Sequence, residues 1–292
     1  PHSLSARATH DTKRGEDVRA RINVLSEIPE EWSRQWDRWR ELNRSRKRTI
    51  DGREAPDAND EYFLYQTLVG AYPFHESEHP DFLKRMKAYV IKAVREAKVH
   101  TAWLKPDNRY EDAYVGFLEE ILDLSSENPF LKTFLPFQRR VSWYGMFHSL
   151  SQILIKMTAP GIPDFYQGTE LWDLTLVDPD NRRPVDYEKR RGLLQRMAAR
   201  EREDVSGLIG ELLSSMEDGR VKLFLVYKGL TVRNRLGDLF ERGEYVPLEV
   251  RGARKEHVVA FARKFKGLWA ATVCPRFLSE IIGEGQQPLG EG

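Results

Sequence analysis

The residues with the most obvious chemistry lie near the start of the chain, where His10, Asp11, Lys13 and Arg14 fall within five positions. Their imidazole, carboxylate, ammonium and guanidinium groups can together donate hydrogen bonds to a hydroxyl-rich ligand and accept them from it. The residues that follow, 15–25, have the apolar spacing of a helix. A polar cluster between a strand and a helix is where an α/β barrel places its catalytic groups. A His-Asp pair is also common on surfaces, so these residues alone leave both interpretations open.

Two longer stretches carry a family resemblance. Residues 8–21, ATHDTKRGEDVRAR, resemble a signature of the maltooligosyltrehalose synthases, a group within the α-amylase family of glycoside hydrolases and transglycosylases. Residues 160–170, PGIPDFYQGTE, and the later LVDPDNRRPVD at 176–186 resemble a second signature of the same group. The resemblance extends from His10 to about Arg276.

The resemblance implies a reaction and roles for two residues. The whole enzyme would convert the reducing-end α-1,4 bond of a maltooligosaccharide into an α,α-1,1 trehalose linkage. Retaining glycosidic chemistry needs a nucleophilic carboxylate and an acid about 5 Å apart, and the resemblance puts that Asp and Glu on barrel strands that would precede Pro1. Asp11 would stabilise the transition state through the sugar hydroxyls, and His10 would hydrogen-bond the same sugar. We expect a piece of a longer protein that is inactive alone.

Other residues near these signatures are predicted to bind substrate. Lys13 and Arg14 precede a helix, where a positive charge is unfavourable because it opposes the helix dipole. Contact with a sugar would give these residues a reason to be there; the alternative is that they are simply solvated. Tyr166 either stacks on a pyranose ring or packs under its own loop. The loop from Asp173 to Asp186 could be held by Asx turns and ion pairs instead of contacting sugar. The full set of predicted substrate-binding residues is Lys13, Arg14, Tyr166, Gln167, Glu170 and Asp180.

Apolar spacing predicts a fold that is mainly α. The resemblance implies that it is a fragment of a (β/α)8 barrel with a helical insertion between strands 7 and 8, followed by the start of an antiparallel β-domain. Residues 1–24 would hold the end of strand 7 and its helix, and 25–140 an all-helical inserted subdomain that covers the site. Residues 141–242 would contain strand 8 with flanking helices, and 243–292 a truncated C-terminal β-domain. A barrel closes with eight strands, so the remaining strands would leave edges through which the fragment could dimerise.

Apolar spacing and breaker residues place the individual elements. Trp32, Trp36 and Trp39 form a stripe that we assign to the core, and residues 51–59 are predicted to form a loop. Apolar spacing and the resemblance favour a helix over a strand at Val221–Leu236. The predicted helices are Pro29–Arg48, Asp60–Ala71, Pro80–Val99, Asn108–Leu124, Phe137–Met157, Tyr187–Arg202, Val205–Met216 and Val221–Leu236. The predicted strands are Gly161–Tyr166, Tyr245–Val250, His257–Arg263 and Leu268–Val273.

Composition narrows the partners. The 46 basic and 45 acidic residues nearly cancel, so no net charge attracts nucleic acid or a membrane surface, and the run 44–48 is predicted to be a solvated helix end. Cys274 is the only cysteine, which favours a reducing cytoplasm. No apolar run approaches the roughly 20 residues that cross a bilayer. His75 and His79 are four apart but lie in a predicted loop, so we expect no metal and no cofactor.

Two other functions compete with this interpretation. The long helical region, without a complete active site, could be a non-catalytic interaction module with an exposed apolar face. Alternatively, the whole enzyme could be another α-amylase-family hydrolase, such as a trehalohydrolase or an amylase. Those share His-Asp and the Gly-x-Pro-x-x-Tyr-x-Gly pattern, but not the Lys-Arg-x-Glu-Asp-Val-Arg extension at residues 13–19 or the stretch at 176–183.

Overall fold

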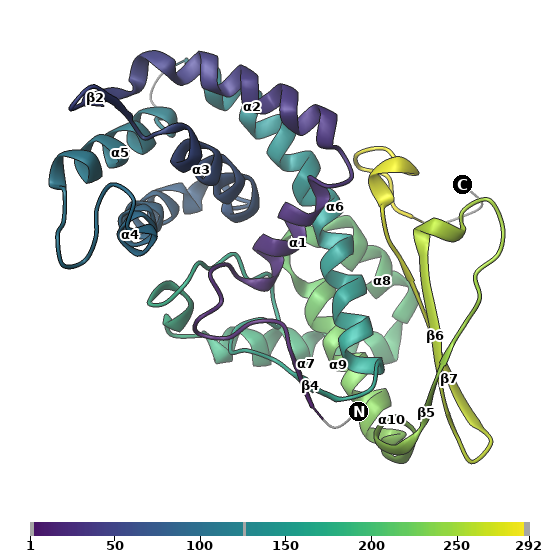
Figure 1. The fold of residues 1–292 in the computed structure, drawn as a ribbon. Helices are drawn as coiled ribbons and strands as arrows, with labels where there is room; N and C mark the ends of the chain where they lie inside the picture. The colour runs from purple at the N-terminus through teal and green to yellow at the C-terminus, as the bar shows by residue number, and fades with distance from the viewer. Residues whose placement is uncertain (1–2, 125–126, 289–292) are drawn as a thin grey trace.

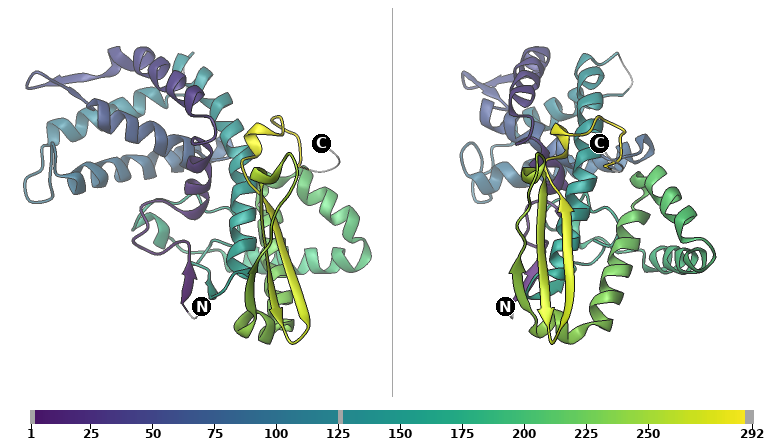
Figure 2. Two further views of the ribbon diagram at one scale, coloured as in Figure 1. Left: turned by 45° about the vertical axis from the view of Figure 1, so that its right-hand side comes forward. Right: turned by 90° about the vertical axis from the view of Figure 1, so that its right-hand side faces the viewer.

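The computed structural model describes residues 3–124 and 127–288 and is mainly helical with small sheets (Figures 1 and 2). Residues 1–2, 125–126 and 289–292, parts of three predicted units, lie outside the described residues. The α-helices are α1 (Glu16–Val24), α2 (Pro29–Asn43), α3 (Ala58–Ala71), α4 (His79–Ala97), α5 (Asn108–Ile121), α6 (Pro129–Thr158), α7 (Tyr187–Glu203), α8 (Val205–Ser214), α9 (Arg220–Arg235) and α10 (Gly237–Arg242). The strands are β1 (Leu4–Ala6), β2 (Arg48–Ile50), β3 (Arg53–Ala55), β4 (Ile162–Asp164), β5 (Glu244–Pro247), β6 (Val258–Phe265) and β7 (Leu268–Pro275).

The first and fourth strands form a parallel pair that joins distant parts of the chain. Leu4 lies opposite Ile162 and Ala6 opposite Asp164. Within the described residues this sheet has two strands, so both of its outer edges lack a strand partner. Leu4 is 67% exposed and Ile162 56% exposed. Purely parallel sheets are normally larger and covered on both faces, so this pair has the character of an incomplete sheet.

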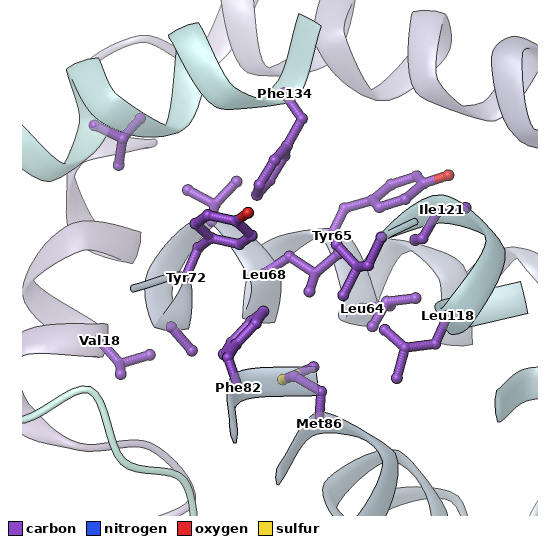
Figure 3. Close-up of a cluster of buried hydrophobic side chains, with 14 of the residues drawn as sticks. Val18, Leu64, Tyr65, Leu68, Tyr72, Phe82, Met86, Leu118, Ile121 and Phe134 are labelled. Atoms are coloured by element: carbon purple, nitrogen blue, oxygen red, sulfur yellow. The ribbon is translucent and has the colours of Figure 1, made fainter. Parts of the chain in front are cut away.

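Helices α2 to α6 pack around a core rich in aromatic rings. Trp39 is fully buried, with its ring centroid 5.5 Å from those of Tyr65 and Phe134. Trp32 is also buried and Trp36 packs against the same core, as the sequence predicts for this stripe. Figure 3 shows labelled side chains from α1, α3, α4, α5 and α6 pointing toward one another. Burial of such rings supplies the largest apolar stabilisation per residue.

Helix α6 is longer than predicted, because the sequence pattern places its start at Phe137 and the helix begins at Pro129. The side chain of Asn128 accepts a hydrogen bond from the Phe130 backbone N–H and so caps the helix start. Pro136 lies inside the helix; a proline normally marks a helix boundary, which is why the earlier turns were missed. The predicted division at residue 140 therefore falls within one continuous helix.

The prediction of a loop over residues 51–59 was wrong. Strands β2 and β3 form a hairpin there, with Arg48 opposite Ala55 and Ile50 opposite Arg53. Asp51 and Gly52 both have positive φ angles, 49° and 78°, and Asp-Gly is the residue pair that two-residue hairpin turns favour. The basic run beside it is not wholly solvated either, since the buried Lys47 ammonium lies 2.6 Å from the buried Glu61 carboxylate.

The C-terminal strands form an antiparallel sheet in the order β5-β6-β7, near the three predicted positions. Strand β7 lies beside the second half of α6, where the Ser151 hydroxyl donates to the Pro275 carbonyl (Figure 2). The ambiguous stretch at 221–236 is helix α9, with Leu223 and Val226 buried. None of the helices within the described residues has the length and apolarity needed to span a membrane.

Candidate functional site

His10 and Asp11 lie on an exposed turn beyond the carboxyl end of β1. The His10 Nε2 atom is 3.1 Å from Asp11 Oδ2, and the two side chains are 52% and 83% exposed. Two hydrogen bonds between Thr9 and Thr12 close the turn. The Thr9 N–H donates to the Thr12 hydroxyl at 2.8 Å, and the Thr12 N–H donates to the Thr9 carbonyl at 3.2 Å. The pair is therefore accessible on a locally ordered turn.

The loop after β4 runs beside this turn (Figure 1). The Asn181 side-chain amide donates to the carbonyls of Thr9 and His10, at 3.3 and 3.0 Å. Further along, the Gly15 N–H donates to the Thr175 carbonyl at 2.7 Å. Because β1 and β4 are parallel, their carboxyl ends meet at one edge. The structure thus brings the two sequence signatures into contact.

Lys13 and Arg14 are directed to the helices and not to the His10 turn. The Lys13 ammonium lies 2.7 Å from the Glu96 carboxylate on α4, which raises the pKa of Lys13. The Arg14 guanidinium donates to the Thr67 hydroxyl at 2.9 Å and lies 4.7 Å from the centre of the Phe63 ring. Neither residue is merely solvated, and both link the turn to the helical region.

The predicted carboxylates on the post-β4 loop are held by arginines. Glu170 lies 3.0 Å from the Arg190 guanidinium, and Asp180 lies 2.9 Å from that of Arg85. Asp178 likewise pairs with Arg182 at 2.9 Å. The loop is not a simple surface turn, because Leu176 and Val177 are buried in the core.

The two remaining predicted residues differ in environment. Tyr166 is half-buried, and its backbone carbonyl accepts hydrogen bonds from Thr169. Gln167 is exposed and lines a cleft of about 1000 Å³, which Asp180 also lines. His10, Asp11 and Tyr166 do not line that cleft. The loop therefore contacts the His10 turn and also lines this cleft, and Asn181 does both.

A buried ionic network lies beneath the site, and sequence reasoning missed it. The Lys222 ammonium on α9 is fully buried, 2.9 Å from a Glu16 carboxylate oxygen and 2.7 Å from one of Asp17, both on α1. The same Asp17 side chain accepts from the Asp173 backbone N–H at 2.5 Å and from the Ser149 hydroxyl. The network joins α1, α6, α9 and the loop after β4. The only sequence signal was two acidic residues at the start of an otherwise apolar helix face.

The pKa directions show that these charges depend on one another. Burial alone would raise the pKa of Glu16, but Lys222 with Arg7 and Lys156 lowers it below its usual value. Burial alone would lower the pKa of Lys222, but Asp17 and Glu16 raise it. Both groups therefore stay charged near neutral pH. At Lys156 the nearby Glu16 carboxylate does not offset the effect of burial, and the pKa of Lys156 falls to about 8.

One cluster has ligand types suited to a metal ion. Asp57, Asp60 and His100 each bring one such atom within 4.8 Å of the others. Hydrogen bonds already account for the arrangement: Asp57 caps α3 by accepting from the Asp60 N–H, its other oxygen lies 2.7 Å from His100 Nε2, and Tyr110 donates to Asp60. This cluster lies at the tip of the helical region.

A scan of protein-family models finds no match to the chain. A curated protein from Mycobacterium tuberculosis (strain CDC 1551 / Oshkosh), named as a putative maltooligosyl trehalose synthase, is 35% identical over 263 residues, covering 90% of this chain and 30% of its own length. The structure of maltooligosyltrehalose synthase from Arthrobacter ramosus is 33% identical and matches with a TM-score of 0.77, over 98% of this chain and 33% of that one. A further crystal structure of a maltooligosyl trehalose synthase is 38% identical, with a TM-score of 0.75 over 89% of this chain and 32% of its own.

These similarities relate the chain to part of the proteins named as maltooligosyl trehalose synthases. The chain is a homologue of the maltooligosyl trehalose synthases. It spans about 30% of the length of the curated relatives that it matches.

Proposed function

We propose that this chain forms the sugar-binding part of an intramolecular transglucosylase, which converts the reducing-end α-1,4 bond of a maltooligosaccharide into an α,α-1,1 linkage. One observation carries the proposal: the exposed His10–Asp11 pair and the loop after β4 meet at the carboxyl ends of two parallel strands. In α/β sheets and barrels that edge is where ligands bind. The homology to maltooligosyl trehalose synthases supports the choice of reaction.

Asp11 and His10 have the properties that their proposed roles need. An ionised carboxylate accepts hydrogen bonds from two neighbouring hydroxyls, and such bonds strengthen as an oxocarbenium-like transition state develops. Asp11 is exposed enough to receive a sugar ring, and the turn that carries it is held by Asn181. His10 donates or accepts on the same ring. Tyr166 and Gln167 contact the sugar from the neighbouring loop, whereas Lys13 and Arg14 position the turn through α3 and α4.

The nucleophile and the acid are supplied by sequence outside this chain. Glu170, Asp178 and Asp180 each make an ion pair with an arginine. Their carboxylate oxygens are thus already engaged by guanidinium groups of this chain, which suits a structural role better than attack on a sugar carbon. In this proposal β1 and β4 are the seventh and eighth strands of a barrel, with the four sequence-predicted units as its parts.

The helical region covers the site in the whole enzyme. A glucose released from the glycosidic bond must be retained and rejoined, so water has to be kept from the covalent intermediate. The contacts of Arg14 with α3 and of Lys13 with α4, next to the His10 turn, support this role. Removal of this region should raise hydrolysis relative to isomerisation, and an unchanged product ratio would count against its role.

The function is tested with a chimera in which this chain replaces the matching segment of the Arthrobacter ramosus synthase. With maltopentaose, the chimera should form a product that ends in trehalose, whereas the isolated chain should form none. Free trehalose or shorter maltooligosaccharides from the chimera would favour the hydrolase alternatives. Asp11→Asn in the chimera should lower kcat about a hundredfold, the order expected for lost transition-state stabilisation.

Two further expectations belong to this proposal. Leu4 and Ile162 at the exposed sheet edge could let the isolated chain dimerise; size-exclusion chromatography of Ile162→Lys tests that, and an unchanged elution volume argues against it. The proposed cytoplasmic location accords with Cys274, which is buried and whose pKa is raised by burial to about 11.

A further inference from the structure

The cleft along the post-β4 loop is large and has walls from distant parts of the chain. Asn181, which donates to the His10 carbonyl, lines it, whereas His10 and Asp11 do not. The volume of the cleft is about 1000 Å³. One wall comes from the segment around Phe74 and the start of α4, another from the loop that carries Gln167 and Trp172, and a third from α7. Small-molecule sites usually enclose about 300 to 1000 Å³. The cleft therefore has room for several sugar rings.

The charged side chains that line the cleft mostly neutralise one another. Arg85 pairs with Asp180 at 2.9 Å. Arg183 pairs with Asp81 at 3.0 Å, and Arg220 with Asp218 at 2.7 Å. Lys189 and Arg196 also line the cleft without an ion pair among the described residues, but so do the carboxylates of Glu78, Asp186 and Glu217, so charges of both signs are present in similar number. The cleft therefore does not favour an anion or a cation. It offers many hydrogen-bond donors and acceptors side by side, which suits a neutral ligand rich in hydroxyl groups.

The cleft also has a fixed aromatic side chain. The Trp172 indole N–H donates to the Met216 carbonyl at 2.7 Å, and its ring lies 6.4 Å from that of Phe74, centre to centre. Both rings line the cleft and are only partly buried. An aromatic ring held in one orientation offers an apolar face at little cost in conformational entropy.

From the size, the compensated charge and the fixed ring, we propose that this cleft is a second saccharide site, which binds a segment of an α-1,4-glucan away from the reacting bond. The choice of α-1,4-glucan rests on the proposed function. Gln167 connects the two sites, because it lines the cleft and belongs to the loop that lies beside His10. The cleft would hold a long chain on the enzyme between successive reactions.

The test is isothermal titration of the 292-residue chain with maltohexaose, and with cellohexaose as the stereochemical control. Trp172→Ala should weaken maltohexaose binding about tenfold, the loss expected for one aromatic platform. Trp103→Ala is the matched control, since Trp103 is 54% exposed on the loop between α4 and α5 and does not line the cleft. It should leave the affinity unchanged.

A second variant guards against misfolding of Trp172→Ala. Lys189 and Arg196 line the cleft from α7, are exposed, and make no ion pair among the described residues. Replacing both with alanine should preserve the circular dichroism spectrum and weaken binding several-fold. The inference is overturned if maltohexaose does not bind, if both variants bind like the parent chain, or if cellohexaose binds equally well.

The same titration separates this inference from the proposed function. If the chimera forms no trehalose-ended product but Trp172-dependent maltohexaose binding persists, the proposed function fails and the second site stands. If the chimera is active and the isolated chain binds no maltohexaose, the second site fails.

Discussion

Two regions of this molecule are stabilised by opposite means. Around Trp39, helices α2, α3 and α6 bury aromatic rings against one another. Around Lys222, helices α1, α6 and α9 and the loop after β4 meet through buried charges and hydrogen bonds. The aromatic core tolerates imperfect geometry because apolar contact is non-directional. The ionic network stabilises only when every partner is present, because desolvated charges are costly alone.

The comparison indicates how the site is held. The network lies beneath the junction of the two sequence signatures, and it fixes α1, which follows Asp11, against the loop that follows β4. A directional network can set the relative position of two loops, whereas an apolar contact sets mainly their proximity. The aromatic core stabilises the helices, and the ionic network defines the geometry at the site.

The largest expected effect comes from breaking the network. Lys222→Met leaves Glu16 and Asp17 buried without their cation and should lower the free energy of unfolding by about 4 kcal/mol at neutral pH. In the parent chain the pKa of Glu16 is lowered, so its stabilising contribution is present above about pH 4.5 and is lost at lower pH. In the variant, Glu16 keeps Arg7 and Lys156 nearby but loses Lys222, the largest of its compensating charges. Its pKa should therefore lie above that of the parent chain, so protonation on acidification relieves part of the defect.

Urea unfolding at about pH 7 and about pH 4.5 measures this difference. The difference in the free energy of unfolding between the parent chain and Lys222→Met should be smaller at the lower pH. A difference that is the same at both pH values would show that Lys222 acts only by filling space. Lys264→Met, on the C-terminal sheet, is a lysine control outside the network and should change stability little at either pH.

The matching test in the aromatic region is Phe134→Ala. Phe134 is fully buried, with its ring centroid 5.1 Å from that of Phe130 and 5.5 Å from that of Tyr72. Its truncation should lower the free energy of unfolding by about 3 kcal/mol. The loss should be equal at about pH 7 and about pH 4.5, because no charge is uncovered. A pH-dependent loss would weaken the contrast between the two regions.

A smaller effect is expected at the link between the two loops. Asn181→Ala removes the donor to the Thr9 and His10 carbonyls and should cost about 1 kcal/mol. The consequence should be local, with faster hydrogen exchange at residues 9–12 and little change in α2–α5. In the active chimera, kcat should fall more than KM changes, since the proposed role of this contact is to position the turn.

The smallest effect is expected for Lys13→Ala. Its ion pair with Glu96 joins two substantially exposed side chains, and such pairs contribute about 0.5 kcal/mol or less. Thermal unfolding should therefore show almost no shift, and that small contribution should disappear at high salt. A loss comparable to that of Asn181→Ala would mean that Lys13 takes part in a wider network.

The sequence predicted the helices of the aromatic region well but did not predict the buried ionic network. The predicted helices within α2–α5 and α7–α9 are present, because apolar spacing and capping residues act over a few positions. Most ends shift by three residues or fewer, but Pro29–Arg48 was too long, since α2 ends at Asn43 and Arg48 begins β2. Failures occurred where two local signals conflicted. Pro136 suggested a boundary inside α6, and the Asp-Gly turn at 51–52 was assigned to a loop although it closes a hairpin.

The candidate site was predictable only in part. His10, Asp11 and the loop carrying Tyr166 were identified by two contiguous signatures, and the structure brings those signatures together. The side-chain partners were not predictable. Lys13 pairs with Glu96, Arg14 contacts Phe63, and Asp180 pairs with Arg85, each across a long stretch of sequence. Trp172, which lines the cleft of the proposed second saccharide site, does not belong to any motif recognised in the sequence.

The sequence by itself determined most of the helices, the three C-terminal strands and the two signatures that carry the family resemblance, since each depends on residues a few positions apart. Only the tertiary structure decided that β1 pairs with β4, that Lys222 meets Asp17 across 205 residues, and that a cleft opens along the loop. The physical reason is that buried charges and cavities depend on the distance between elements in space. That distance leaves no periodic pattern in the chain.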